Sequence, residues 1–113
     1  MKRILPIFIL TVLLFTATAS AGIQTAYVNP TLGFNGTTAS CKLTVTDQGK
    51  HIDATLELWR GSTFVTSWHE TGTSSVRISE TYDCISGVSY FLKAYGTVGG
   101  YDFDTQTWSQ ICP

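Results

Sequence analysis

The clearest hydrophobic pattern in the chain lies in residues 37–47, where apolar and polar side chains alternate without a break. This period of two predicts a β-strand with one buried face and one solvated face. Residues 52–59 repeat the pattern. Five shorter or less regular β-rich runs occur at residues 23–34, 63–69, 75–82, 88–98 and 101–111. The inward side chains expected in the two clearest strands are Ala39, Cys41, Leu43, Val45, Ile52, Ala54, Leu56 and Leu58.

Short polar segments separate these runs and predict turns. Asn35-Gly36 and Gly99-Gly100 favour two-residue hairpins, because these residue types tolerate a positive φ. Residues 47–50 are predicted as a further turn and residues 71–74 as a linker. Pro30 lacks the N–H that a central strand donates, so we expect the first run to be an edge strand broken by a bulge.

Seven short strands at near-even spacing, with no helical period after the N-terminal segment, indicate an all-β fold. We therefore predict a single antiparallel β-sandwich of about seven strands, immunoglobulin-like or fibronectin-like. Tyr90 stands where such sandwiches often carry a corner tyrosine. Leu92 occupies the position at which antibody domains carry the second core cysteine, so the antibody disulfide is not expected.

The N-terminal residues differ in composition from the rest of the chain. Two basic residues precede an apolar run at residues 4–15, and Ala19-Ser20-Ala21 forms a small-residue cleavage site. This order predicts a secretory signal peptide at residues 1–21, followed by the sandwich domain at residues 22–113. The apolar run is shorter than the roughly 20 residues of a membrane-spanning helix. We expect a secreted, extracellular protein that meets a membrane only through the uncleaved signal peptide.

Removal of the signal peptide leaves five basic and eight acidic residues, a net charge of −3. The basic residues are scattered singly along the chain. Nucleic acids and anionic membranes bind clustered basic surfaces, so neither is expected as a partner.

Five segments carry a resemblance to a known family. They are Gly36-Thr37-Thr38-Ala39-Ser40-Cys41, residues 52–59, Trp68 ahead of the linker, Thr81-Tyr82 and Gly87-Val88-Ser89-Tyr90. Together they resemble an uncharacterised family of short secreted proteins from Gram-positive bacteria. The resemblance covers nearly all of the secreted chain and implies a secreted bacterial sandwich of unknown function, without site residues to carry over.

The secreted chain keeps all 3 cysteines, and an odd number outside the cell predicts one pair with a leftover, or an intermolecular pair. Folding the last two strands about Gly99-Gly100 places Cys112 opposite the region of Gly87, a few residues from Cys84. We therefore favour a Cys84–Cys112 disulfide at the open end of the sandwich, with Cys41–Cys84 as the first alternative and another pairing or none as the second. Cys41 lies on an inward face, where a free cysteine behaves as a small hydrophobe.

No catalytic or metal-binding pattern is assignable in the sequence, and no cofactor is expected. His69-Glu70 are neighbours, so on a strand they point to opposite faces. His51 and Asp53 share a face but lack a third metal ligand. Asp102 and Asp104 alternate without the glycine-punctuated loop typical of a calcium site. We expect a protein that is not an enzyme.

The aromatic residues support a binding function. The chain has 3 tryptophans and 5 tyrosines, several in phase with polar neighbours. Large rings beside hydrogen-bonding side chains are typical of surfaces that bind a carbohydrate or a protein. We therefore predict a non-catalytic binding module that recognises a glycan or a protein through Trp108, Phe91, Tyr95 and Trp59, whereas Trp68 is expected in the core. The alternative is a structural or self-associating cell-surface protein that uses an open sheet edge and the unpaired cysteine.

Overall fold

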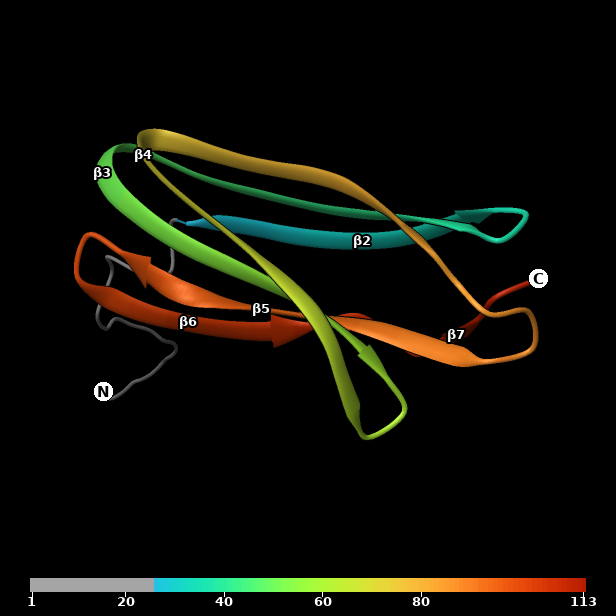
Figure 1. Cartoon of the computed structure of the whole chain (residues 1–113). Helices are drawn as coiled ribbons and strands as arrows, with labels where there is room; N and C mark the ends of the chain where they lie inside the picture. The colour runs from blue at the N-terminus through green and yellow to red at the C-terminus, as the bar shows by residue number, and fades with distance from the viewer. Residues whose placement is uncertain (1–25) are drawn as a thin grey trace, which may run out of the picture.

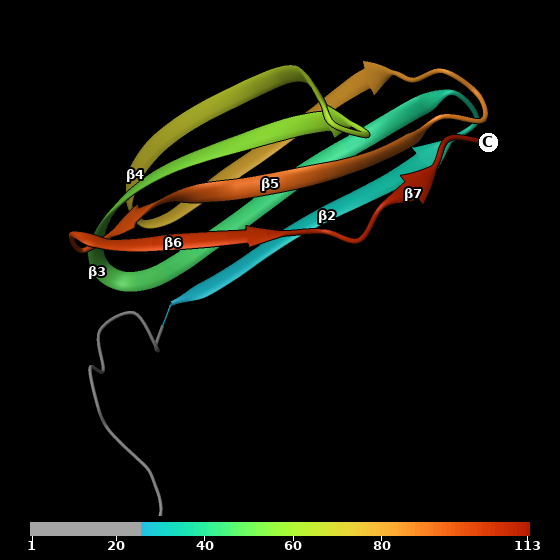
Figure 2. The same ribbon diagram turned by 90° about the horizontal axis from the view of Figure 1, so that it is seen from below.

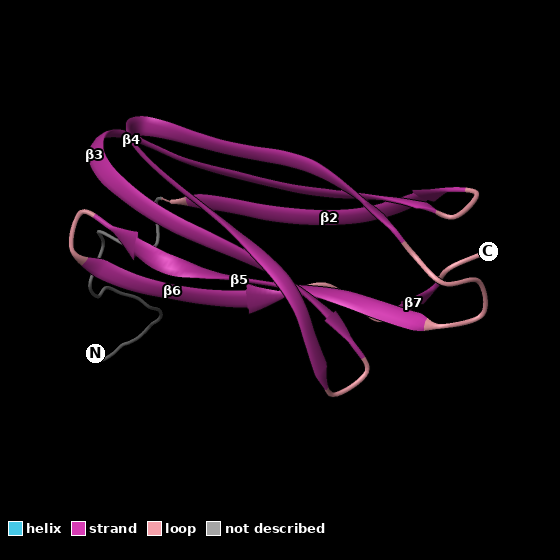
Figure 3. Cartoon of the chain, viewed as in Figure 1, coloured by secondary structure: helices cyan, strands magenta, loops and turns pink. Residues whose placement is uncertain are grey.

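The protein is all-β over residues 26–113, the part of the chain that the computed structural model describes (Figure 3). Six strands form one antiparallel sheet (Figure 1). They are β2 (Tyr27–Asn35), β3 (Thr38–Arg60), β4 (Thr63–Asp83), β5 (Ser89–Val98), β6 (Tyr101–Gln106) and β7 (Gln110–Ile111). Within residues 26–113, no helix has the length and apolar character needed to cross a membrane.

The predicted all-β, antiparallel class is confirmed, and the finer prediction of a two-sheet sandwich with seven strands is not. The six described strands belong to a single sheet that curls like half of a barrel (Figure 2). The predicted signal peptide, residues 1–21, lies outside the described residues.

β3 and β4 form one long hairpin that is folded over near its middle. The predicted turn at 47–50 and the predicted linker at 71–74 lie inside these strands and meet at the Asp47–Ser74 pair. The register shifts there, so residues 48–50 have no partner in β4. Gly49 N–H donates a hydrogen bond of 2.9 Å to the Ser74 hydroxyl, and both residues have a positive φ. The two expected breaks are therefore one corner, at which the sheet curls (Figure 1).

The corner divides the sheet into two parts that share β3 and β4. The first half of β3 pairs with β2 on one side and with the second half of β4 on the other. The second half of β3 pairs with the first half of β4 and with β5, which in turn pairs with β6 and β7. In Figure 2, β7 lies beside β2, so the two ends of the curled sheet approach each other.

The concave side of the curled sheet carries the core. All the side chains expected to point inward from residues 37–47 and 52–59 are 0% exposed. β5 adds Tyr90 and Leu92, which are buried to the same extent, and Trp68 packs against the core as predicted. Each fully buried leucine stabilises the fold by about 2 kcal/mol.

Both predicted hairpins are present, and the first has its turn displaced by one residue. Asn35 pairs with Thr38, so the turn residues are Gly36 and Thr37. Only Gly36 has a positive φ, of 62°, the φ pattern of a type II′ turn. At Gly99-Gly100 both φ angles are positive, at 57° and 85°, as a type I′ turn requires.

Pro30 lies in an edge strand, as predicted, but the predicted bulge is absent. β2 pairs with β3 in unbroken register from Tyr27 to Asn35. Outside this ladder, the Leu32 carbonyl accepts a hydrogen bond of 3.0 Å from Gln110 Nε2. Leu32, and Pro30 two residues away, therefore direct their backbone polar groups to the open edge. The missing N–H of Pro30 interrupts no pairing with β3.

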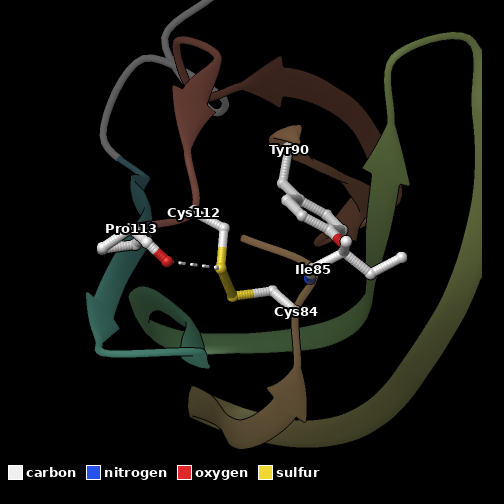
Figure 4. The surroundings of a disulfide bond; sticks show 5 residues. All are labelled: Cys84, Ile85, Tyr90, Cys112 and Pro113. Atoms are coloured by element: carbon white, nitrogen blue, oxygen red, sulfur yellow. Dashed lines mark hydrogen bonds between the residues drawn. A yellow bond between two sulfur atoms is a disulfide. The ribbon is translucent and has the colours of Figure 1, made fainter. Parts of the chain in front are cut away.

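The predicted Cys84–Cys112 disulfide is present and ties the C-terminal segment to the end of β4 (Figure 4). Cys112 also exchanges backbone hydrogen bonds of 2.8 and 2.9 Å with residues 87–88. Beside the disulfide, the fully buried Tyr90 accepts a hydrogen bond of 2.9 Å on its hydroxyl from Ile85 N–H. This bond to the backbone a few residues upstream has the geometry of a corner tyrosine.

Candidate functional site

A row of three aromatic rings crosses the outer face of the sheet, opposite the core. It consists of Phe64 in β4, Trp59 in β3 and Phe91 in β5, because Trp59 pairs with Phe64 on one side and with Phe91 on the other. The centroids of Trp59 and Phe64 are 5.9 Å apart in an edge-to-face contact. Those of Trp59 and Phe91 are 6.2 Å apart, with an interplanar angle of 18°. We call these three residues the aromatic row.

Two charged side chains contact the central ring of the row, and a tyrosine bonds to one of them. Lys93 Nζ lies 4.3 Å from the Trp59 ring centroid, a cation–π contact. Glu57 accepts a hydrogen bond of 2.9 Å from Trp59 Nε1 and one of 3.0 Å from the Tyr95 hydroxyl. The bond to Glu57 raises the pKa of Tyr95, because it stabilises the protonated phenol. The Trp59 ring is thus fixed from several sides before any ligand arrives.

Exposed surface remains on this face in spite of these contacts. Phe64 is 48% exposed and Tyr95 is 40% exposed, whereas Trp59 and Phe91 are half-buried. Rings of this size beside charged groups form an amphipathic surface that suits a ligand with both apolar and hydrogen-bonding parts.

Polar side chains continue the same face beyond Tyr95. His69 Nε2 lies 2.7 Å from Asp53 Oδ1 across the β3–β4 pair. On the other side of Tyr95, Asp104 lies opposite it in β6, and Asp102 follows on the same strand face. In the sequence, His69 is the neighbour of Glu70, and Asp53 shares a strand face with His51. The structure pairs His69 with Asp53 instead, because the register of two strands decides which side chains meet.

Trp108 lies apart from the aromatic row. It is 90% exposed in the segment between β6 and β7, and it lines a cleft next to β2. The structure therefore brings together three of the predicted binding residues, Trp59, Phe91 and Tyr95, and separates the fourth.

Phe64 belongs to the row but is absent from the sequence prediction. The alternation in residues 63–69 is irregular because a bulge leaves Val65 without a partner in β3. The signal that locates Phe64 is the short Gly61-Ser62 turn, since a two-residue turn after Arg60 places Trp59 opposite Phe64.

In residues 26–113, no group of three or more His, Cys, Asp and Glu side chains could hold a metal ion. Cys41 is free and fully buried. Burial raises the pKa of the Cys41 thiol from 9.0 to about 11, because the charged thiolate is desolvated there. A neutral, enclosed thiol is a poor nucleophile and is out of reach of a second chain.

The raised pKa of Cys41 predicts a loss of stability in alkaline solution. Below about pH 9 both states hold the proton, and between about pH 9 and 11 the unfolded thiol ionises while the folded one does not. The free energy of unfolding should fall over this range by at most about 2 to 3 kcal/mol. Urea unfolding of the wild type and of Cys41→Ala, near both ends of the range, measures the difference. Equal losses in the two proteins would contradict the prediction.

Comparisons of the chain with protein-family models, with curated proteins and with solved structures found no match. The resemblance to a family of short secreted bacterial proteins therefore stays a prediction. The functional inferences below rest on the geometry of this chain.

Proposed function

We propose that the protein is a secreted, non-catalytic binding module that recognises a glycan through the aromatic row. The observation that carries this proposal is the alignment of Phe64, Trp59 and Phe91 across three neighbouring strands, with Tyr95 beside them on the same face. A sheet face with aromatic rings on three neighbouring strands offers a ligand several successive contacts.

The chemistry of this face suits a sugar chain. A sugar ring presents C–H bonds on its faces and hydroxyl groups around its edge, and C–H groups pack well on the electron-rich face of an aromatic ring. Glu57, Lys93 and Tyr95 lie next to the rings and supply groups that bind hydroxyls. Because these side chains are already held by mutual contacts, binding costs little side-chain entropy.

We place the protein outside the cell after removal of residues 1–21. The Cys84–Cys112 disulfide is compatible with this location, because disulfides persist in oxidising compartments. We further propose that the two parts of the curled sheet correspond to the two layers of an immunoglobulin-like sandwich. The hydrogen bond from Ile85 N–H to the Tyr90 hydroxyl, which is typical of a corner tyrosine in such sandwiches, supports this correspondence.

Phe91→Ala and Tyr95→Ala are each expected to weaken glycan binding at least about tenfold, since each removes ring surface from the contact. A glycan array identifies a ligand, and titration calorimetry then measures Kd for each variant. Tyr101→Ala is the matched control, because Tyr101 is 56% exposed and lies in β6, outside the row. Its affinity and its melting temperature should equal those of the wild type.

Unchanged affinity in both Phe91→Ala and Tyr95→Ala would overturn the proposal, as would the absence of any glycan ligand. If Phe91→Ala unfolds, that ring belongs to the core, and Tyr95→Ala alone then decides. Binding of a protein in place of a glycan, lost in the same variants, would support the other partner class predicted from the sequence.

A further inference from the structure

A second candidate site lies where the two ends of the curled sheet approach each other. Residues 28–32 of β2 face residues 105–108 and Gln110 across an open cleft of about 410 Å³. Trp108, the most exposed of the large apolar side chains in the described part of the chain, stands at this cleft. The aromatic row contributes nothing to its lining.

The backbone on both sides of Trp108 is held in place. Thr107 accepts a hydrogen bond from Leu92 N–H on its hydroxyl and donates its own N–H to the Leu92 carbonyl, both at 2.9 Å. Gln110 belongs to β7, which pairs with β5, and Cys112 is fixed by the disulfide. The fold therefore presents the Trp108 ring to solvent from an anchored segment, where the ring is available for contact with a ligand.

The lining of the cleft is polar and uncharged. Its hydrogen-bonding side chains are three amides and three hydroxyls, those of Asn29, Gln106, Gln110, Thr31, Thr105 and Thr107. Neither an acidic nor a basic side chain lines it. A charged ligand would lose hydration in the cleft without gaining an ion pair. A neutral ligand that is rich in hydroxyls would replace its bonds to water by bonds to these groups.

An extended peptide fits this cleft poorly, even though β2 offers an open strand edge. The Leu32 carbonyl, which faces that edge, is already bonded to Gln110 Nε2 at 3.0 Å. Pro30, the next residue that faces the edge, has no N–H to donate. A strand added to β2 would gain no hydrogen bond from Pro30, and it could bond to the Leu32 carbonyl only by displacing Gln110.

From these observations we propose that the cleft between β2 and Trp108 binds a neutral carbohydrate segment. The Trp108 ring packs against a sugar ring, and the amides of Asn29, Gln106 and Gln110 bind its hydroxyl groups. The ligand class is that of the proposed function, but the residues differ, so each of the two sites can fail without the other. Two sites on one domain allow a polysaccharide to be held at two points, which raises the apparent affinity.

Titration calorimetry with neutral oligosaccharides of glucose, mannose and N-acetylglucosamine tests the inference, with an acidic oligogalacturonate as comparison. Trp108→Ala is expected to reduce the number of neutral oligosaccharides bound per chain by one, without a change in melting temperature, because the ring is 90% exposed. Trp108→Phe should retain binding in the cleft with a Kd raised about tenfold or less. Thr31→Glu places a charge in the cleft and should weaken binding there, whereas Thr81→Glu, an exposed site on β4, is the matched control.

Phe91→Ala separates this inference from the proposed function. If both hold, Phe91→Ala and Trp108→Ala each remove a different binding event, and the double variant binds nothing. If the aromatic row does not bind glycans, the wild type shows a single binding event, and Trp108→Ala abolishes it. The inference is overturned if Trp108→Ala leaves stoichiometry and Kd unchanged, if the acidic oligosaccharide binds the cleft as tightly as the neutral ones, or if no neutral oligosaccharide binds to the folded Phe91→Ala or Tyr95→Ala variant.

Discussion

Replacement of Cys84 and Cys112 together by serine is expected to lower the free energy of unfolding by about 3 to 4 kcal/mol, since the disulfide closes a loop between residues 28 positions apart. Domains of this size have a total stability of only about 5 to 15 kcal/mol, so the loss is a large fraction. The variant also releases the anchor of β7, and amide exchange should rise in residues 110–112. Urea unfolding of both proteins measures the change in stability.

The wild type in the presence of a reductant is the direct control for this prediction. Its unfolding midpoint should move to that of the double variant, whereas Cys41→Ala should keep its sensitivity to the reductant because Cys41 takes no part in the disulfide. The mass of the intact protein should rise by two hydrogen atoms on reduction. A midpoint that does not respond to the reductant would contradict the prediction.

Gly96→Ala is expected to destabilise the protein by about 3 kcal/mol or more, and to prevent folding if the reserve of stability is small. Gly96 lies in β5 opposite Ala54 and has a φ of 151°, which L side chains rarely adopt. A methyl group at this position would run into the backbone carbonyl oxygen of Asp53. The added carbon would be fixed to the backbone of β5 and the oxygen belongs to the backbone of β3, so relief requires the two strands to separate.

Gly33→Ala is the matched control for this substitution. Gly33 also lies in a strand, β2, but an added methyl group would have no atom within 4 Å and the φ is ordinary. We expect Gly33→Ala to change stability by less than about 1 kcal/mol, in the stabilising direction. Thermal melting of the two variants provides the comparison, and similar melting temperatures for both would show that the close approach at Gly96 is not rigid.

The disulfide could be predicted from the sequence because a two-residue hairpin converts position in the chain into position in space. With Gly99-Gly100 as the turn, Val98 pairs with Tyr101, and continuing the count brings Cys112 to residues 87–88. The same arithmetic at Gly61-Ser62 would have placed Phe64 beside Trp59, but the bulge at Val65 concealed the phase of that strand.

The corner of the sheet could not be predicted in the same way. Residues 47–50 and 71–74 have the composition of turns, and a turn normally ends a strand. Here the two segments meet at the Asp47–Ser74 pair, and the hairpin continues through both with a shift in register. Two breaks that coincide across a hairpin bend the sheet instead of ending it, and only the pairing of β3 with β4 shows that they coincide.

The sequence by itself determined the all-β class and the side chains that point inward in residues 37–47 and 52–59, because alternation along a strand is a local property of the chain. It also determined the hairpin turns, through the conformational freedom of glycine at Gly36 and at Gly99-Gly100. The tertiary structure alone decided that the strands form one curled sheet, that Phe64 completes the aromatic row, and that Trp108 stands at a separate cleft. These features depend on the register between strands and on the approach of the two ends of the sheet, which join residues far apart in the chain and leave no local pattern.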